Sequence, residues 1–200
     1  MKRLLTGVLL ACAASLAHAD TWRVDLLVFA HEGRAGAERA RPAHPVQAEA
    51  AIPLEERARL EANGIRILSP EDSRLNEHWR RLHNATAFRP LLRLSWTQRD
   101  PPPRGGPSVL LRHGRPLLSP EGEAVRQLEG VFRLTLRRYL HLDADLRWSE
   151  RDAMTGLLRS WPLREQRRMQ SESLHYIDSA RLGLLVEIRR ADQRADDTRN

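Results

Sequence analysis

The chain has 200 residues, of which 33 are Lys or Arg and 26 are Asp or Glu, giving a formal net charge of +7 at pH 7. Every basic residue except Lys2 is arginine, and the arginines are spread along the chain without a long basic block. Cys12 is the only cysteine, so a chain that has lost it has no disulfide, no cysteine nucleophile and no thiolate metal ligand.

Residues 1–19 have the pattern of a signal peptide. Two basic residues follow the first Met, residues 4–16 are almost entirely apolar, and Ala17 and Ala19 provide the small side chains that signal peptidase reads. The apolar run is shorter than the roughly 20 residues that span a bilayer. We therefore predict cleavage between Ala19 and Asp20 and export to the periplasm of a Gram-negative cell. The exported chain would have no transmembrane segment, and nucleic acid is excluded as a partner.

Residues 9–12, Leu-Leu-Ala-Cys, loosely match the sequence at which lipoproteins are cut and acylated. Lipid anchoring through Cys12 is therefore an alternative. Leu10, just before the Ala of this motif, fits the lipoprotein pattern poorly, and the apolar run would shrink to residues 4–10. Cleavage before Asp20 is therefore favoured.

After the predicted signal, apolar and polar residues mostly alternate, which is typical of half-buried strands. Residues 21–30 form the first such stretch, with apolar side chains at the even positions. Residues 31–51 lack periodicity and predict a loop. Residues 54–63 predict a short helix that ends at Gly64, the usual residue at a left-handed helix cap.

A second helix is predicted from Ser69, which would cap it, with Pro70 at its first position. Leu75, Trp79 and Leu82 recur at helical spacing and would form its buried stripe.

The next stretches again predict strands and turns. Residues 88–97 alternate, residues 99–107 are rich in Pro and Gly and predict a long hairpin connection, and 109–112 predict a short strand before a turn at 113–114. Residues 120–124 predict a further loop.

The longest alternating stretch is 131–148, where only Arg138 breaks the register. It predicts one long amphipathic strand that bends at a bulge or pairs with two neighbours. Residues 164–178 predict a polar edge strand, 182–188 a last strand, and 191–200 a flexible C-terminal tail.

These elements predict an α+β fold over residues 20–190: a single two-layer domain built on one mostly antiparallel sheet of about five to seven strands. The short helices around residues 54–82 would cover its apolar face. The opposite face would be rich in arginine and would carry Tyr139 and His141.

His141, Asp143 and Asp145 lie on one side of the predicted long strand and raise the question of a metal site. Neighbours two residues apart on a strand are about 7 Å apart, which is too far to close on one ion without further ligands. A solvated polar row paired with arginines of the next strand is favoured, and neither a metal nor a cofactor is predicted.

His175 and Asp178 could belong to a hydrolytic triad, but no Gly-x-Ser-x-Gly or Ser-x-x-Lys motif supplies a nucleophile. No catalytic residue is predicted. Residues 164–169, ahead of Tyr176, place amide and guanidinium groups near an aromatic ring, which suits a glycan-peptide ligand. A charged edge strand that resists aggregation explains the same residues equally well.

Several blocks in order along the chain resemble the CsiV family: residues 22–29, 128–146, 163–169, 174–178 and 183–186. The resemblance implies a small, non-catalytic periplasmic protein that binds peptidoglycan and supports cell-wall synthesis and cell shape. It brings no ligand residues that could be carried over.

The predicted partners are peptidoglycan and the envelope proteins that synthesise it. The hypothetical contact surface consists of Arg137, Tyr139, His141, Asp143, Arg167, Arg168, His175 and Tyr176. Two alternatives remain open: a protein-only scaffold that docks on a lipoprotein or synthase, and a peptidoglycan hydrolase.

Overall fold

The computed structural model describes residues 20–32, 41–42, 48, 50–119, 122–152 and 154–191. The strands are β1 (Thr21–His31), β2 (Arg41–Pro42), β3 (Ala51–Pro53), β4 (Ile65–Ile67), β5 (Phe88–Arg99), β6 (Ser108–Leu118), β7 (Ala124–Leu136), β8 (Leu140–Arg151), β9 (Leu158–Met169), β10 (Leu174–Asp178) and β11 (Leu182–Arg190). The helices are α1 (Arg57–Ala62), the short 3₁₀ helix η1 (Pro70–Asp72) and α2 (Asn76–His83). The predicted signal peptide and all but the first residue of the predicted tail lie outside the described residues.

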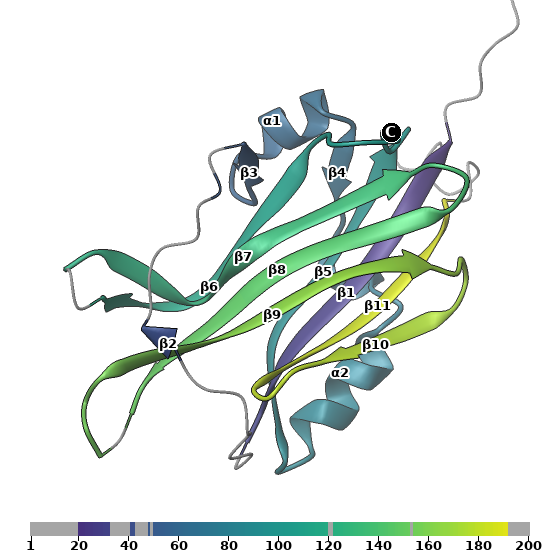
Figure 1. Ribbon diagram of the computed structural model, residues 1–200. Coiled ribbons are helices and arrows are strands. Elements are labelled where there is room, and N and C mark those ends of the chain that lie inside the picture. The colour runs from purple at the N-terminus through teal and green to yellow at the C-terminus, as the bar shows by residue number, and fades with distance from the viewer. Residues whose placement is uncertain are drawn as a thin grey trace, which may run out of the picture.

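The described strands form two sheets. One has the order β10-β11-β1-β5-β4 and the other β2-β9-β8-β7-β6-β3, and all pairings are antiparallel except that of β3 with β6. In Figure 1, β7, β8 and β9 pass in front of β1, β5 and β11. The antiparallel character is confirmed, but the single predicted sheet was wrong. Alternation indicates that one face of a strand is buried, and it does not say what buries it.

The two sheets share one apolar core. Val24, Leu26 and Val28 of β1 are buried in the same cluster as Leu142 and Leu146 of β8. Burial of inward-facing side chains from two sheets is the packing of a β-sandwich. The even positions of β1, β7, β8 and β11 therefore face the opposite sheet.

The helix α2 packs on the outer face of the five-stranded sheet. Leu27 and Phe29 of β1 are buried there with Leu75, and Trp79 and Leu82 pack against them. This explains why β1 is buried on both faces. The predicted stripe of Leu75, Trp79 and Leu82 is thus apolar contact surface, but it lies outside the core that the two sheets share.

The predicted second helix is divided. Ser69 precedes only the 3₁₀ helix Pro70–Asp72 and makes no side-chain cap, and α2 begins separately at Asn76. The predicted helix end at Gly64 is confirmed, since this residue has a φ of 76° just after α1. None of the described helices is long and apolar enough to cross a bilayer.

The stretch 131–148 is a hairpin of β7 and β8, so the predicted single long strand was wrong. Leu136 pairs with Leu140 across the turn at residues 137–139. The two partners are both even-numbered, so even positions face the core on both strands and the alternation passes through the turn unchanged. Arg138, which breaks the register, lies in the turn. Similarly, β6 continues past the turn predicted at residues 113–114, with a register shift there.

The buried carboxylate of Asp25 connects the segment between η1 and α2 to the five-stranded sheet. Asp25 of β1 is 0% exposed and accepts hydrogen bonds from Arg23 Nε at 2.9 Å, from Ser95 Oγ at 2.6 Å and from the backbone N of Arg74 at 3.1 Å. Burial alone raises the pKa of Asp25, but these hydrogen bonds and the charge of Arg23 outweigh it and hold the pKa below its ordinary value.

We expect Asp25→Asn to lower the free energy of unfolding at neutral pH by about 3 kcal/mol, because Arg23 loses its carboxylate partner in a partly buried site. The stability that the Asp25 carboxylate contributes to the wild type is fully present above the pKa of about 3.9 that Asp has in the unfolded chain. It is lost as pH falls through the lower pKa of Asp25 in the folded protein. The difference between the two proteins should therefore shrink in acid. Urea unfolding of both proteins along a pH series measures it.

Asp143→Asn is the matched control, because this exposed carboxylate lies 3.5 Å from Arg133 and should contribute less than about 1 kcal/mol. Equal losses in the two variants would contradict the role assigned to Asp25.

Candidate binding site

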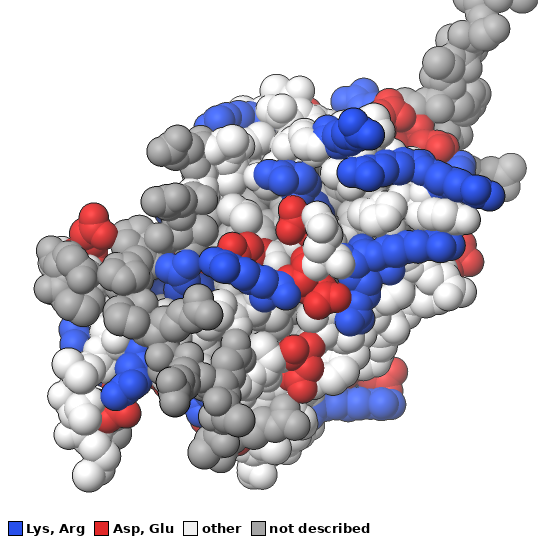
Figure 2. Space-filling view, in the orientation of Figure 1, with Lys and Arg blue, Asp and Glu red and all other residues white. Residues whose placement is uncertain are grey.

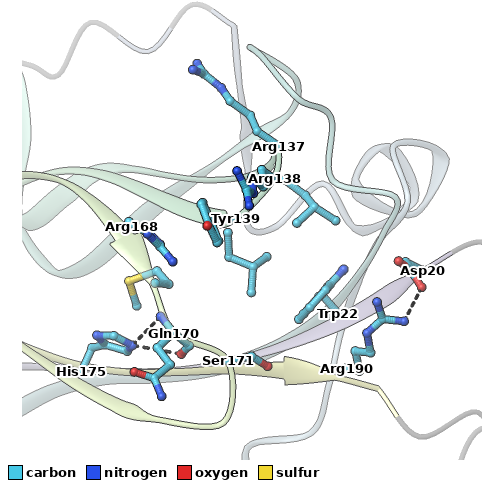
Figure 3. A pocket seen from close by; sticks show the side chains of 13 residues that line it. Asp20, Trp22, Arg137, Arg138, Tyr139, Arg168, Gln170, Ser171, His175 and Arg190 are labelled. Carbon is cyan, nitrogen blue, oxygen red and sulfur yellow. Dashed lines mark hydrogen bonds and ion pairs between the residues drawn. The ribbon is translucent and has the colours of Figure 1, made fainter.

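A pocket of about 720 Å³ lies at one end of the sandwich. The turn between β7 and β8, the connection between β9 and β10, the start of β1 and the end of β11 all contribute to its walls (Figure 3). Both sheets thus bring strand ends to the same place. Pockets of several hundred Å³ with a few convergent polar groups are the usual form of ligand sites.

The β7–β8 turn is held in place by the proline-rich connection between β5 and β6. The backbone N of Leu136 donates to Pro102 O at 3.1 Å, and Arg137 Nε donates to Pro103 O at 2.9 Å. Within the turn, Arg137 N donates to Tyr139 O at 3.1 Å. These hydrogen bonds therefore fix the backbone of the turn that carries Arg137, Arg138 and Tyr139.

Tyr139 is the centre of a group of guanidinium ions. The Cζ atom of Arg168 lies 3.3 Å from the centroid of the Tyr139 ring, and that of Arg138 lies 5.5 Å from it. The pairing of His141 with Arg168 brings the end of β9 beside the turn. Guanidinium groups over an aromatic ring are stabilised by the ring's negative face.

Trp22 and Arg190 form a second stacked pair on the other sheet. They are direct partners between β1 and β11, with the Arg190 Cζ 5.3 Å from the Trp22 ring. Arg190 Nη1 also contacts Asp20 Oδ1 at 2.7 Å. Trp22 is 6% exposed, and its Nε1 has no hydrogen-bond partner among the described residues. A buried donor without a partner is uncommon in native proteins.

The pocket carries an excess of positive charge. Within the described part of the chain, Arg137, Arg138 and Arg168 form no ion pair with a carboxylate. Among the described residues that line the pocket, Asp20 is the only acid, and it already pairs with Arg190. A pocket of this kind attracts anions.

The middle of the outer face of the six-stranded sheet is different, because its charges are paired. Asp143 lies 3.5 Å from Arg133 of β7, and Asp145 lies 3.2 Å from Arg164 of β9. Figure 2 shows blue and red side chains interleaved across this face. The predicted polar row paired with arginines of the next strand is confirmed. No group of three or more potential metal ligands occurs among the residues the structure describes.

A smaller hollow of about 350 Å³ extends from the pocket onto this outer face. Arg137 and Arg168 line both the hollow and the pocket. His141 and Asp143 line the hollow only, and His141 Nδ1 donates to Tyr139 O at 2.9 Å. Four of the predicted contact residues, Arg137, Tyr139, His141 and Arg168, are thus close neighbours.

Other predicted contact residues lie apart from this group. Arg167 pairs with the buried Leu142, so it points to the opposite side of β9 from Arg168, and its Nη1 donates to Tyr176 O at 3.2 Å. The Tyr176 ring stacks on Phe29, with centroids 6.3 Å apart, on the outer face of the other sheet. The single surface expected from the sequence is therefore divided, because neighbours on a strand alternate in direction.

His175 lines the end pocket, but it does not pair with Asp178. Its Nε2 lies 3.1 Å from the backbone N and 3.0 Å from the backbone O of Gln170. Asp178 instead contacts His31 Nε2 at 2.5 Å. His31 is 4% exposed and packs edge-on against Phe88. The histidine and aspartate suggested for a hydrolytic triad are therefore not assembled.

Sequence patterns missed Asp20, Trp22, Arg138 and Arg190 as pocket residues. Trp22 occupies an apolar position of an alternating strand and is buried in the core, so alternation gave no sign that it also lines a pocket. The break in alternation at Arg138 was the available signal for a turn. The pairing of Trp22 with Arg190 depends on strand register, which the sequence does not give.

Together, the two stacked sheets and this pocket define a β-sandwich protein with a cationic end pocket, an arrangement suited to binding. A family model described as "Peptidoglycan-binding protein, CsiV" matches residues 3–191, so the chain belongs to the CsiV family. The resemblance noted in the sequence is thereby confirmed. Neither the curated proteins nor the solved structures compared with the chain gave a match.

Proposed function

We propose that the protein binds peptidoglycan through its end pocket and, without catalysing a reaction, supports cell-wall synthesis in the periplasm. The observation that carries the proposal is the group of guanidinium ions around Tyr139, where Arg137, Arg138 and Arg168 lack carboxylate partners among the described residues. Membership of a family of peptidoglycan-binding proteins supports it.

The chemistry of the pocket suits a glycan-peptide polymer. Peptidoglycan stem peptides carry carboxylates, which the guanidinium fork binds in a bidentate manner. A volume of about 720 Å³ can accept a fragment larger than a single sugar or amino acid. The hollow on the outer sheet face continues the surface beyond the pocket and could contact a neighbouring part of the polymer.

A periplasmic location agrees with this ligand. The predicted cleavage before Asp20 would leave the described domain free in the compartment that contains the cell wall. Lipid anchoring through Cys12 would place the same domain in the same compartment.

Arg168→Ala should weaken binding to purified sacculi, whereas Arg167→Ala should not. Arg168 lines the pocket, but Arg167 points to the other side of β9 and contacts Glu165 and Tyr176 O. Loss of one charge-assisted contact, worth about 1.5–3 kcal/mol, predicts a roughly tenfold or greater loss of affinity. Pulldown with sacculi at several protein concentrations measures it.

The control for charge is Arg81→Ala on α2, which removes an exposed arginine on the outer face of the other sheet. Circular dichroism confirms that each variant is folded before binding is compared. If Arg168→Ala binds sacculi with the affinity of the wild type, or if all three variants lose affinity equally, the pocket is not the binding site.

The protein should release no soluble muropeptides from intact sacculi, because His175 and Asp178, which a hydrolytic triad would need side by side, each contact another partner. Chromatography of the supernatant after long incubation measures release, and a muralytic enzyme is the positive control. If the wild type releases muropeptides and His31→Ala or Asp178→Asn abolishes this release, the protein is a hydrolase and the non-catalytic assignment is overturned.

A further inference from the structure

We infer that the end pocket recognises the carboxylates of the stem peptide and not the sugar rings of the glycan. This inference rests on the proposed binding of peptidoglycan and identifies which part of the polymer the pocket reads. It follows from how the aromatic rings and the guanidinium groups are arranged in Figure 3.

The aromatic rings of the pocket already have guanidinium groups against them. Arg168 lies 3.3 Å from the Tyr139 centroid and Arg190 lies 5.3 Å from the Trp22 centroid. A sugar that stacked on the ring face covered by a guanidinium group would have to displace a favourable cation–π contact. Trp22 is also 94% buried, since only 6% of it is exposed, which leaves little ring surface for a sugar. The rings therefore act as supports for the arginines.

The guanidinium groups, in contrast, have unused donors. Among the described residues, Arg138 and Arg168 make ring contacts with Tyr139 and no hydrogen bond through their N–H groups. Arg137 donates its Nε to Pro103 O, which fixes the guanidinium, and its terminal nitrogens make no hydrogen bond or ion pair with the described residues. A planar fork that is held in place loses less entropy when it binds a carboxylate.

Asp20 shows that the pocket accepts a carboxylate. Its Oδ1 lies 2.7 Å from Arg190 Nη1 at the edge of the pocket, beside the Trp22 ring. Asp20 therefore occupies one cationic position that a ligand carboxylate could otherwise use. It also lowers the positive potential that a ligand would meet.

The direct test compares defined fragments by isothermal titration calorimetry with the full chain that begins at Asp20. The fragments are a disaccharide with its stem peptide, the same compound with its carboxylates amidated, the free stem peptide, and peptide-free glycan strands. We expect the first and third to bind, with at least about a tenfold loss on amidation. Binding should also weaken as salt is raised.

Asp20→Asn provides a gain-of-function test that misfolding cannot imitate. Removing this carboxylate frees Arg190 and should tighten binding of the carboxylate-bearing fragment severalfold, with no effect on the amidated one. Asp145→Asn is the matched control, because Asp145 pairs with Arg164 outside both the pocket and the hollow. It should leave the affinity unchanged.

The outcomes separate the inference from the function on which it rests. The carboxylate inference would be overturned if peptide-free strands bound equally well, if amidation left the affinity unchanged, or if Asp20→Asn bound more weakly than the wild type. In each of these cases, binding of the wild type to sacculi would still support the proposed function. Failure of the wild type to bind sacculi at all would overturn both.

Discussion

The apolar core between the two sheets is the constraint on which the rest of the structure depends. Burying the even positions of β1, β5 and β11 against the even positions of β7 and β8 and the odd positions of β9 fixes how the sheets stack. At about 25 cal/mol per Å² of apolar surface, this burial is the main source of stability, and with Cys12 in the predicted signal no disulfide would assist it. Stacking also brings strand ends from both sheets together, so Trp22 of one sheet lies near Tyr139 of the other.

The arginines of the chain serve two different roles in this framework. Arg23, Arg133 and Arg164 pair with carboxylates and either fasten layers together or neutralise the sheet surface. Those around Tyr139 instead contact its ring and have no carboxylate partner within the described residues. Since the core supplies the stability, these arginines are available for an external anion. Composition alone does not distinguish the two roles, because the residue type is the same.

Much of the fold could be predicted from alternation, which identified β1, β5 and β11 as strands and the even positions of 131–148 as buried. It could not distinguish a long strand from the β7–β8 hairpin, because Leu136 and Leu140 have the same parity. It also could not tell whether a helix or a second sheet covers the core. The contact surface expected from the sequence includes the pocket residues Tyr139, from the alternation of 131–148, and Arg168, from the polar segment 164–169. Their contact depends on the register of β8 with β9, a long-range property that local patterns do not encode.

The central claim is that a ligand occupies the end of the sandwich where the two sheets meet. Amide hydrogen exchange with and without a soluble peptidoglycan fragment tests it most directly, because exchange reports on each segment of the folded protein. Added protection is predicted at residues 136–140 and 168–171, with residues 76–83 of α2 unchanged. Protection confined to α2, or to the hairpin ends at residues 115–118 and 154–158, would contradict the claim.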